Sequence, residues 1–300
     1  MHVIAVFGPT GVGKTAVALA LADRLRAAGE DPVAVSADAL QVYAGLEVLT
    51  GAASAHERER LEHRLLGVLP VTATFSAGEY ARRAHGEIDG LLADQRRPIV
   101  VGGTGLYLQA ALTQLDLRPP VPHAIRAART QQLHDHGPET LHAELAAVAP
   151  EAAATVRPTD AQRIVRALEL LDAGHEPPAT GGLWTARMRH PTLLAGLIMD
   201  RDALYARIDA RVGAMVAAGA ADEVRRAATA GASVTARKAV GFDELQHGDV
   251  AAMQQRTRRY AKRQLTWMRR LDAAQRIDVT GREPEDVADE LYAALREREA

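Results

Sequence analysis

The chain contains no cysteine, which excludes disulfide bonds, thiolate metal ligands and a cysteine nucleophile. Any bound metal is therefore expected to have oxygen ligands. A signal peptide or membrane span is also not expected at the start. The first apolar run, residues 3–7, is short, ends at Gly8-Pro9 and follows no positively charged segment. We expect a cytoplasmic protein that does not bind a membrane.

The chain also lacks a strong excess of either charge. Its formal net charge is −2 at pH 7, so no overall positive field would attract a nucleic acid. A site for a polyanion would have to come from a local cluster of Arg and Lys. With 47% apolar and 25% charged residues among 300, the composition predicts one large ordered domain, or a domain with a smaller one attached.

Short apolar segments alternate with helical patterns along the chain. Residues 3–7 are typical of a buried parallel strand, and helix-spaced apolar residues follow over 15–28 until Gly29. The β-α-β-α-β order predicts a doubly wound parallel sheet. Further strands are predicted at residues 33–36, 98–101, 193–199 and 276–279, with a closing helix at 283–299.

A proline-rich start marks a segment of different character within this pattern. Residues 118–192 show helical patterns at 125–134 and 161–171 and a loop-like stretch at 177–182. We interpret this segment as an inserted helical subdomain. The catalytic core would then comprise residues 1–117 and 193–300.

The first predicted strand leads into a P-loop. Residues 8–15, GPTGVGKT, match the pattern G-x-x-x-x-G-K-[ST] between a strand and a helix. Glycines let backbone N–H groups turn toward phosphate oxygens, Lys14 adds a positive charge, and Thr15 can ligate Mg²⁺. The pattern predicts a diphosphate or triphosphate ligand. The fold class is therefore α/β, with a P-loop-type doubly wound parallel sheet and an inserted helical subdomain.

The acidic residue expected at a P-loop site is in an unusual place here. A P-loop kinase or hydrolase usually has a magnesium-organising Asp after a later strand, but here that strand ends in Gly102-Gly103-Thr104, and the acid is Asp38, after the second strand. Since parallel sheets bind ligands at the carboxyl ends of their strands, Asp38 is expected to face the ligand. It could ligate Mg²⁺, act as a general base, or cap a helix beginning near Leu40. The amide of Gln41 could read a nucleobase edge, although a solvated glutamine is more common.

Five segments together resemble the ordered motifs of bacterial tRNA dimethylallyltransferases. They extend from residue 8 to residue 267, with an insertion of the expected size after the third strand. Ala39 departs from the usual Ser of the family, so it cannot make that residue's hydrogen bond, and Ala161 departs from the usual Pro. The segments are 8–15 (GPTGVGKT), 38–43 (DALQVY), 98–107 (PIVVGGTGLY), 160–169 (DAQRIVRALE) and 259–267 (RYAKRQLTW).

The resemblance implies transfer of a dimethylallyl group from dimethylallyl diphosphate to N6 of the adenosine 3′-adjacent to the anticodon in tRNA, with release of diphosphate. It implies Mg²⁺ as cofactor, held through Thr15, and Asp38 as general base for the poorly nucleophilic adenine amine. Lys14 would stabilise the leaving group. The residues implied in diphosphate binding are Gly8, Pro9, Thr10, Gly11, Val12, Gly13, Lys14 and Thr15.

One further arginine is expected on the diphosphate. We propose Arg211, or Arg207 one turn before it on the same helix face. The alternative is a solvated basic face that pairs with Asp209 or Asp222, and the sequence favours neither.

The resemblance also implies a set of contacts to tRNA. The helical subdomain would hold the anticodon stem-loop, and the target nucleotide would be flipped out of the stack into a channel, because it cannot otherwise reach the sheet. A helix N-cap is the alternative role for Thr104, and ordinary surface cations are the alternative for Arg126 and Arg163. The implied residues are Asp38, Ala39, Leu40, Gln41, Thr104, Arg126, Asp160, Ala161, Gln162, Arg163 and Ile164.

A basic run lies near the end of the chain. Residues 256–270 contain seven cations and no acid on a predicted helix, which favours a track for RNA phosphates over a solvated face. Tyr260 and Trp267 lie seven residues apart, two helical turns, so we expect them to pack into the core.

Three other functions compete with this interpretation. A small-molecule kinase would share the P-loop but should have a second carboxylate near the phosphate. An enzyme that prenylates free adenosine phosphates should need neither the basic run nor the insertion, and a nucleotide-gated binding module would leave Asp38 without a role. The sequence leaves the oligomeric state open, with a monomer as the working expectation.

Overall fold

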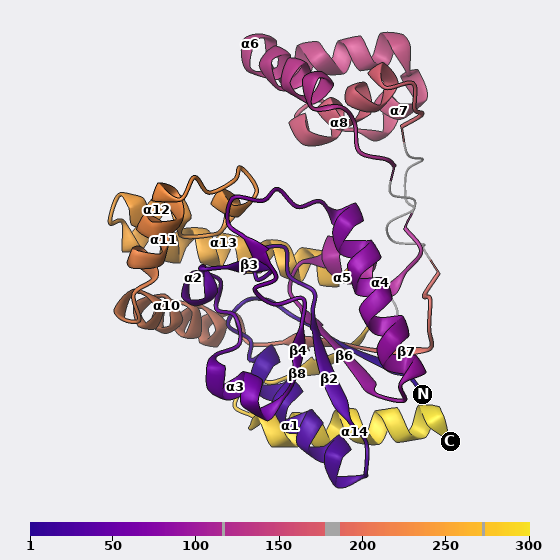
Figure 1. Ribbon diagram of the computed structural model, residues 1–300, viewed down its shortest axis with the longest axis vertical. Coiled ribbons are helices and arrows are strands. Elements are labelled where there is room, and N and C mark those ends of the chain that lie inside the picture. Colours follow the sequence, from indigo (N-terminus) through magenta and orange to yellow (C-terminus); the bar gives the residue numbers. More distant parts are fainter. Residues whose placement is uncertain (116–117, 178–186, 272–273) are drawn as a thin grey trace. The chain divides into compact units, whose positions relative to one another are not determined.

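The computed structural model describes residues 1–115, 118–177, 187–271 and 274–300 (Figure 1). They form two compact units, a larger one of residues 1–113 and 188–300 and a smaller one of residues 114–187. The chain leaves and re-enters the larger unit at an isolated antiparallel bridge between Thr113 and Met188. The unit boundaries thus lie a few residues before the predicted limits of 118 and 192. No helix of the described residues is long and apolar enough to span a bilayer.

Six parallel strands form the central sheet of the larger unit, in the spatial order β4-β2-β6-β1-β7-β8. The predicted doubly wound parallel sheet is confirmed. All residues of β1, which lies between β6 and β7, are buried, and this explains its unbroken run of apolar side chains. The strands are β1 Val3–Phe7, β2 Pro32–Ser36, β4 His63–Arg64, β6 Arg97–Gly102, β7 Thr192–Ile198 and β8 Gln275–Asp278.

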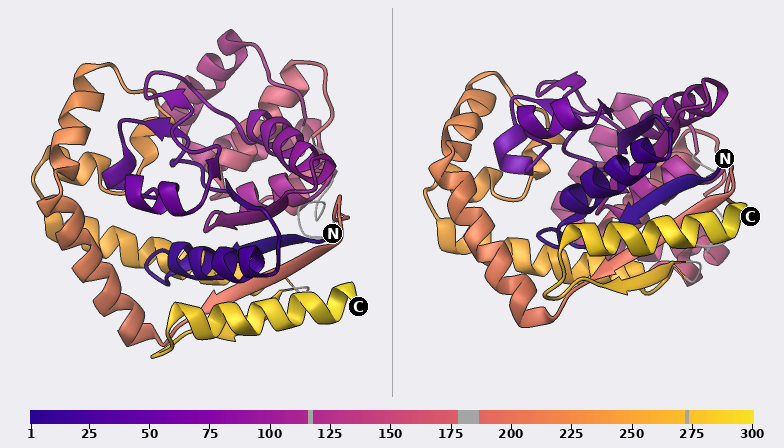
Figure 2. Two further views of the ribbon diagram at one scale, coloured as in Figure 1. Left: turned by 60° about the horizontal axis from the view of Figure 1, so that its bottom comes forward. Right: turned by 90° about the horizontal axis from the view of Figure 1, so that it is seen from below.

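Helices cover both faces of this sheet (Figures 1 and 2). On one face α1 Lys14–Ala27 packs beside α14 Pro284–Glu299, and their apolar side chains share a core with Ile4 and Val6 of β1. On the other face α4 Ala77–Ala93 packs against α5 Gly105–Leu112. The crossover from β1 to β2, which contains α1, and the crossover from β4 to β6, which contains α4, run in opposite directions along the sheet. Right-handed connections that run in opposite directions place their helices on opposite faces.

The larger unit contains further strands and helices besides these. A second sheet of two short strands, β3 Tyr43–Ala44 and β5 Leu69–Pro70, is not among the predicted elements, and neither is β4. The other helices are α2 Glu47–Thr50, α3 Ala55–Arg60, α10 Arg201–Ala217, α11 Ala220–Thr229, the 3₁₀ helix η1 Ala236–Lys238, α12 Phe242–Gln246 and α13 Val250–Met268.

The smaller unit contains the helices α6 His123–Val148, α7 Pro150–Thr155 and α8 Ala161–Asp172. α6 is kinked at Gly137, whose φ of 76° lies in the left-handed region and which precedes Pro138. Apolar side chains from all three helices form a core of their own. The loop predicted at 177–182 lies, from residue 178 onward, outside the described residues.

Candidate active site

The P-loop connects β1 to α1 in the geometry that its glycines predict. Gly11 and Gly13 have φ values of 83° and 103°, in the region that only glycine adopts freely. Gly13 is the N-cap of α1, so the first N–H groups of that helix have no partner within it. The loop therefore presents backbone donors and the positive end of a helix dipole to a ligand.

Lys14 has an unusual environment for a cation. The residue is partly exposed, but protein atoms surround its amine, and this burial lowers the pKa of Lys14 to about 7. The charge of Arg211 acts in the same direction, and the charge of Asp38 opposes both. The Nζ donates to the carbonyl oxygens of Gly8 and Pro9, each at 2.9 Å. A bound polyanion would favour the charged amine, so the position is suited to a phosphate ligand.

Asp38 lies just beyond the carboxyl end of β2. Its Oδ1 accepts a hydrogen bond from the backbone N–H of Leu40 at 2.9 Å, and its Oδ2 accepts one from the Thr104 hydroxyl at 3.4 Å. Residues 39–42 form a bend and a turn that lead into β3. The suggested helix at Leu40 is therefore wrong, because the carboxylate is held in a local turn and across to the neighbouring strand end.

Thr104 precedes α5 at the N-cap position, but its side chain makes no capping hydrogen bond. The hydroxyl lies instead between Asp38 Oδ2 and the Tyr260 hydroxyl, which is 3.0 Å from Thr104 Oγ1. The alternative role as a side-chain N-cap is thus wrong. The structure brings together two residues, Asp38 and Thr104, that follow neighbouring strands in the sheet.

Close backbone contact explains why glycines follow β6. A Cβ on Gly102 would lie 2.2 Å from the carbonyl oxygen of Ala37, and one on Gly103 would lie 3.0 Å from the carbonyl oxygen of Gly8. The N–H of Ala37 also donates to Val101 O at 2.8 Å. The ends of β2 and β6 are therefore too close for any side chain there.

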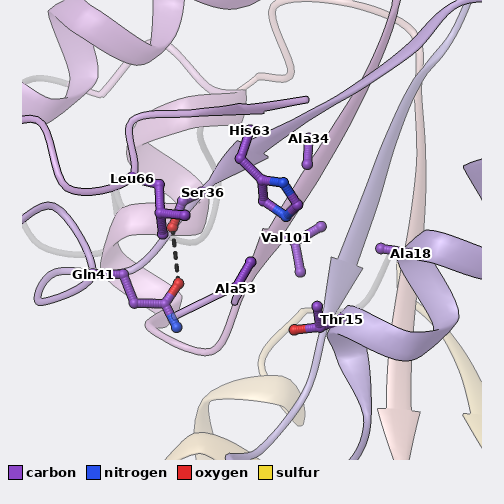
Figure 3. Close-up of a pocket in the computed structure, with 9 residues that line it drawn as sticks. All are labelled: Thr15, Ala18, Ala34, Ser36, Gln41, Ala53, His63, Leu66 and Val101. Carbon is purple, nitrogen blue, oxygen red and sulfur yellow. Dashed lines mark hydrogen bonds between the residues drawn. The ribbon is translucent and has the colours of Figure 1, made fainter. Parts of the chain in front are cut away.

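A small cavity lies beside the P-loop, lined by Thr15, Ser36, Gln41 and His63 together with apolar residues (Figure 3). The Thr15 hydroxyl points toward Gln41 across it. The Gln41 amide is engaged within the protein, since Oε1 accepts from Ser36 Oγ at 3.2 Å and Nε2 donates to Gly51 O at 3.3 Å. Contact of this amide with a nucleobase would require exchange of these bonds.

The two candidate arginines of α10 have different surroundings. Arg211 donates to Gly51 O at 3.1 Å, and its buried Nε has no partner among the described residues. Burial lowers the pKa of Arg211. Arg207 lies at the N-terminus of α1, where its guanidinium would be 3.6 Å from a Cβ on Gly13.

The suggested acidic partners of these arginines bind other residues. Asp209 pairs with Arg258 at 2.5 Å, and Asp222 pairs with Arg225. Pairing of Arg207 or Arg211 with either acid is therefore not seen in the part of the chain that the structure describes.

Tyr260 and Gln264 of α13 are site residues that the sequence did not suggest. Tyr260 was expected in the core, but its hydroxyl contacts Thr104 beside Asp38. Gln264, which is 4% exposed, binds the backbone at Thr10 and Gly103. Trp267 packs against the start of α5, since a Cβ on Gly105 would lie 2.1 Å from its ring. The sequence shows only a glutamine four residues after a tyrosine on one helix face, and nothing in that spacing indicates that the glutamine is buried.

The basic run of α13 is partly neutralised by acids from other elements. Arg256 pairs with Glu244 at 2.7 Å, and Arg258 pairs with Asp209. Although the run itself contains no acid, two of its arginines are therefore paired with acids from other helices. The exposed cations of the run are Arg259, Lys262, Arg263, Arg269 and Arg270.

The remaining predicted RNA contacts belong to the smaller unit. Asp160 is the N-cap of α8 and accepts a hydrogen bond from the N–H of Arg163 at 3.2 Å. Gln162 and the side chain of Arg163 are exposed, whereas Ile164 is fully buried in the core of the unit and offers no surface to a ligand. Arg126 lies 3.4 Å from Glu169.

Comparison with known proteins gives consistent matches over nearly the whole chain. A family model described as IPP transferase matches residues 41–271. A tRNA dimethylallyltransferase of Thermobifida fusca is 40% identical over 89% of this chain and 87% of its own length. A tRNA dimethylallyltransferase of Rhodospirillum centenum is 43% identical over 92% of this chain and 91% of its own length. The crystal structure of a tRNA isopentenylpyrophosphate transferase from Bacillus halodurans is similar with a TM-score of 0.71 and 29% identity, covering 99% of this chain and 98% of that one.

Proposed function

This chain belongs to the IPP transferase family, and we propose that it transfers a dimethylallyl group from dimethylallyl diphosphate to N6 of the adenosine 3′-adjacent to the anticodon in tRNA. The observation that carries the proposal is the pairing of a P-loop with Asp38, whose carboxylate accepts a hydrogen bond from Thr104 at the end of the neighbouring strand β6. A phosphate-binding loop beside a general base suits displacement of diphosphate by an amine.

The diphosphate binds at the N-terminus of α1. The N–H of Thr10 already donates to Gln264 and that of Val12 to Pro9. We therefore assign the anion to the N–H groups at Gly11 and Gly13 and in the first turn of the helix. Lys14 and Arg211 add positive charge where negative charge grows on the departing oxygen. Protein atoms surround the charged groups of both residues, and this strengthens their effect on the leaving group.

Magnesium fits the donors at this position. Mg²⁺ on a phosphate ligand needs only one or two protein oxygens, with water and phosphate oxygens as the other ligands. The Thr15 hydroxyl at the start of α1 is such an oxygen, and its direction in Figure 3 leaves it accessible from the cavity. When bound, Mg²⁺ would neutralise charge on the leaving diphosphate.

Asp38 acts on the nucleophile. The adenine N6 attacks C1 of the prenyl chain, the C1–O bond to diphosphate breaks, and the surplus proton of N6 passes to the Asp38 carboxylate. The hydrogen bonds from Leu40 and Thr104 orient that carboxylate before the reaction. No nucleoside triphosphate takes part in this balance.

The tRNA contacts extend over both units. We assign the exposed cations of α13 to phosphates, and Arg126, Gln162 and Arg163 to the anticodon stem-loop, with the target base flipped out toward Asp38. Ile164 is buried in the core of the smaller unit, so we assign it no contact to RNA. We place the reaction in the cytoplasm and treat the active species as a monomer.

A transfer assay tests the proposal. Purified protein is incubated with radiolabelled dimethylallyl diphosphate and Mg²⁺, and with unmodified tRNA or AMP as acceptor. We expect label in tRNA and none in AMP, and label in neither would refute the function. Asp38→Asn, which keeps the shape of the side chain but removes the base, should lose most turnover while tRNA binding persists.

A further inference from the structure

Gln264 joins two loops of the candidate site through one buried amide. Its Oε1 accepts a hydrogen bond from the N–H of Thr10 in the P-loop, and its Nε2 donates one to Gly103 O after β6, each at 2.8 Å. These partners are far from Gln264 in the sequence and come from two different strand ends. The amide therefore spans the gap between the phosphate-binding loop and the loop that carries Thr104.

Tyr260, one turn earlier on α13, is bonded to the same second loop. Its hydroxyl lies 3.0 Å from Thr104 Oγ1, and Thr104 is the donor to Asp38 Oδ2. Because a threonine hydroxyl has a single proton, Tyr260 must donate to Thr104 when Thr104 donates to Asp38. Burial raises the pKa of Tyr260 above its usual value, so the hydroxyl keeps the proton that this arrangement needs.

The atoms around these contacts are closely packed. A Cβ on Gly103 would lie 2.2 Å from Gln264 Nε2 and 3.0 Å from Gly8 O. Backbone from the P-loop, backbone after β6 and the Gln264 side chain thus touch one another. A shift of α13 would be transmitted to both loops.

We propose that Tyr260 and Gln264 form a positioning pair that sets the separation between the phosphate-binding loop and the general base. Gln264 holds the P-loop against the backbone after β6, and Tyr260 holds Thr104 and, through it, Asp38. The inference rests on the proposed function, in which the attacking N6 and the departing diphosphate must lie on opposite sides of one carbon. A displacement of about 1 Å in such a geometry can cost on the order of a hundredfold in rate.

The test uses variants that remove the contacts and keep the shape. Gln264→Met removes both hydrogen bonds of the amide, and Tyr260→Phe removes only the hydroxyl. Thr266→Ala is the control, because Thr266 is exposed on the same helix and its hydroxyl donates to Lys262 O within that helix. Each variant is measured for kcat, for KM of dimethylallyl diphosphate, for Kd of inorganic diphosphate and for thermal unfolding.

A positioning role predicts a split between rate and binding. For Gln264→Met we expect kcat to fall at least about tenfold while Kd of diphosphate changes less than about threefold, since Lys14 and the first turn of α1 remain. Tyr260→Phe should lower kcat with little effect on either binding constant. Values of kcat within twofold of the Thr266→Ala control would overturn the proposal. A joint fall of kcat, of diphosphate affinity (a rise in Kd) and of melting temperature would also overturn it, because that combination marks a merely structural role.

A second variant and a hydrogen-exchange measurement test the positioning pair separately from the proposed function. If Gln264→Met does not fold, Gln264→Glu preserves the acceptor for Thr10 and removes the donor to Gly103, and the same split in kcat is expected. If the wild-type protein labels neither tRNA nor AMP, the proposed function fails, but hydrogen exchange at the Thr10 amide still reports whether Gln264 holds the P-loop. Faster exchange at this amide in Gln264→Met than in Thr266→Ala supports the positioning pair, and equal protection in the two variants refutes it.

Discussion

Replacement of Gly102 by alanine should disturb the active site from outside it. The new Cβ would lie 2.2 Å from the carbonyl oxygen and 2.7 Å from the carbonyl carbon of Ala37, whereas ordinary contact begins at 3.4 Å. Both partners are backbone, so the ends of β2 and β6 must separate by roughly an ångström. Ala37 directly precedes Asp38, the proposed general base, so Asp38 moves with it. We expect kcat to fall by about tenfold to a hundredfold and the free energy of unfolding to fall by about 1–3 kcal/mol.

Gly86→Ala provides a matched control for this variant. Gly86 is exposed on α4, and a Cβ there would meet nothing within 4 Å. Alanine in a helix interior should raise the free energy of unfolding by about 0.5–1 kcal/mol and leave kcat unchanged. Urea unfolding and the tRNA labelling assay measure both quantities. If Gly102→Ala retained the kcat of Gly86→Ala, the close contact between the two strand ends would not be what positions Asp38.

Three more predictions follow from the charges and the boundaries of the units. Without Mg²⁺, diphosphate affinity should fall about tenfold per pH unit above pH 7, because Lys14, with a pKa of about 7, loses its charge as pH rises. In Lys14→Arg the diphosphate affinity should fall less steeply with pH, because arginine keeps its charge. Equal pH dependence of the affinity in the variant and the wild type, measured by calorimetry, would contradict this role of Lys14. Arg211→Gln should lower kcat more than Arg207→Gln, because Arg211 is the buried cation whose charge acts on Lys14 and Asp38; the reverse order would move the assignment to Arg207. A short turn in place of residues 115–186 should weaken tRNA binding in a filter assay but not diphosphate binding.

Long apolar strands and the P-loop could be predicted from the sequence because each is determined locally. A parallel strand such as β1 is buried on both faces, so its apolar run is unbroken. The two-residue strands β3, β4 and β5 are too short to produce any pattern, and all three are missing from the prediction. The site was predictable to the same extent. Asp38 and Thr104 each follow a strand, and the structure brings them into hydrogen-bond contact.

Contacts made by α13 could not be predicted in this way. Gln264 meets a P-loop residue 254 positions away, and nothing in its own segment indicates that loop. The basic run shows the same limit, since the acids that pair with Arg256 and Arg258 come from α12 and α10. Side-chain partners of this kind depend on how helices dock, which sequence periodicity describes only as an apolar face.

The antiparallel bridge between Thr113 and Met188 has a consequence for the history of the chain. The outgoing and returning segments are already neighbours there, so the entropy of closing the connection changes only slowly with the length of the insertion. All six strands of the central sheet, the P-loop and Asp38 lie in the larger unit. A module at this single junction can be gained, lost or exchanged without rethreading the sheet, so its surface can change while the P-loop and Asp38 stay as they are.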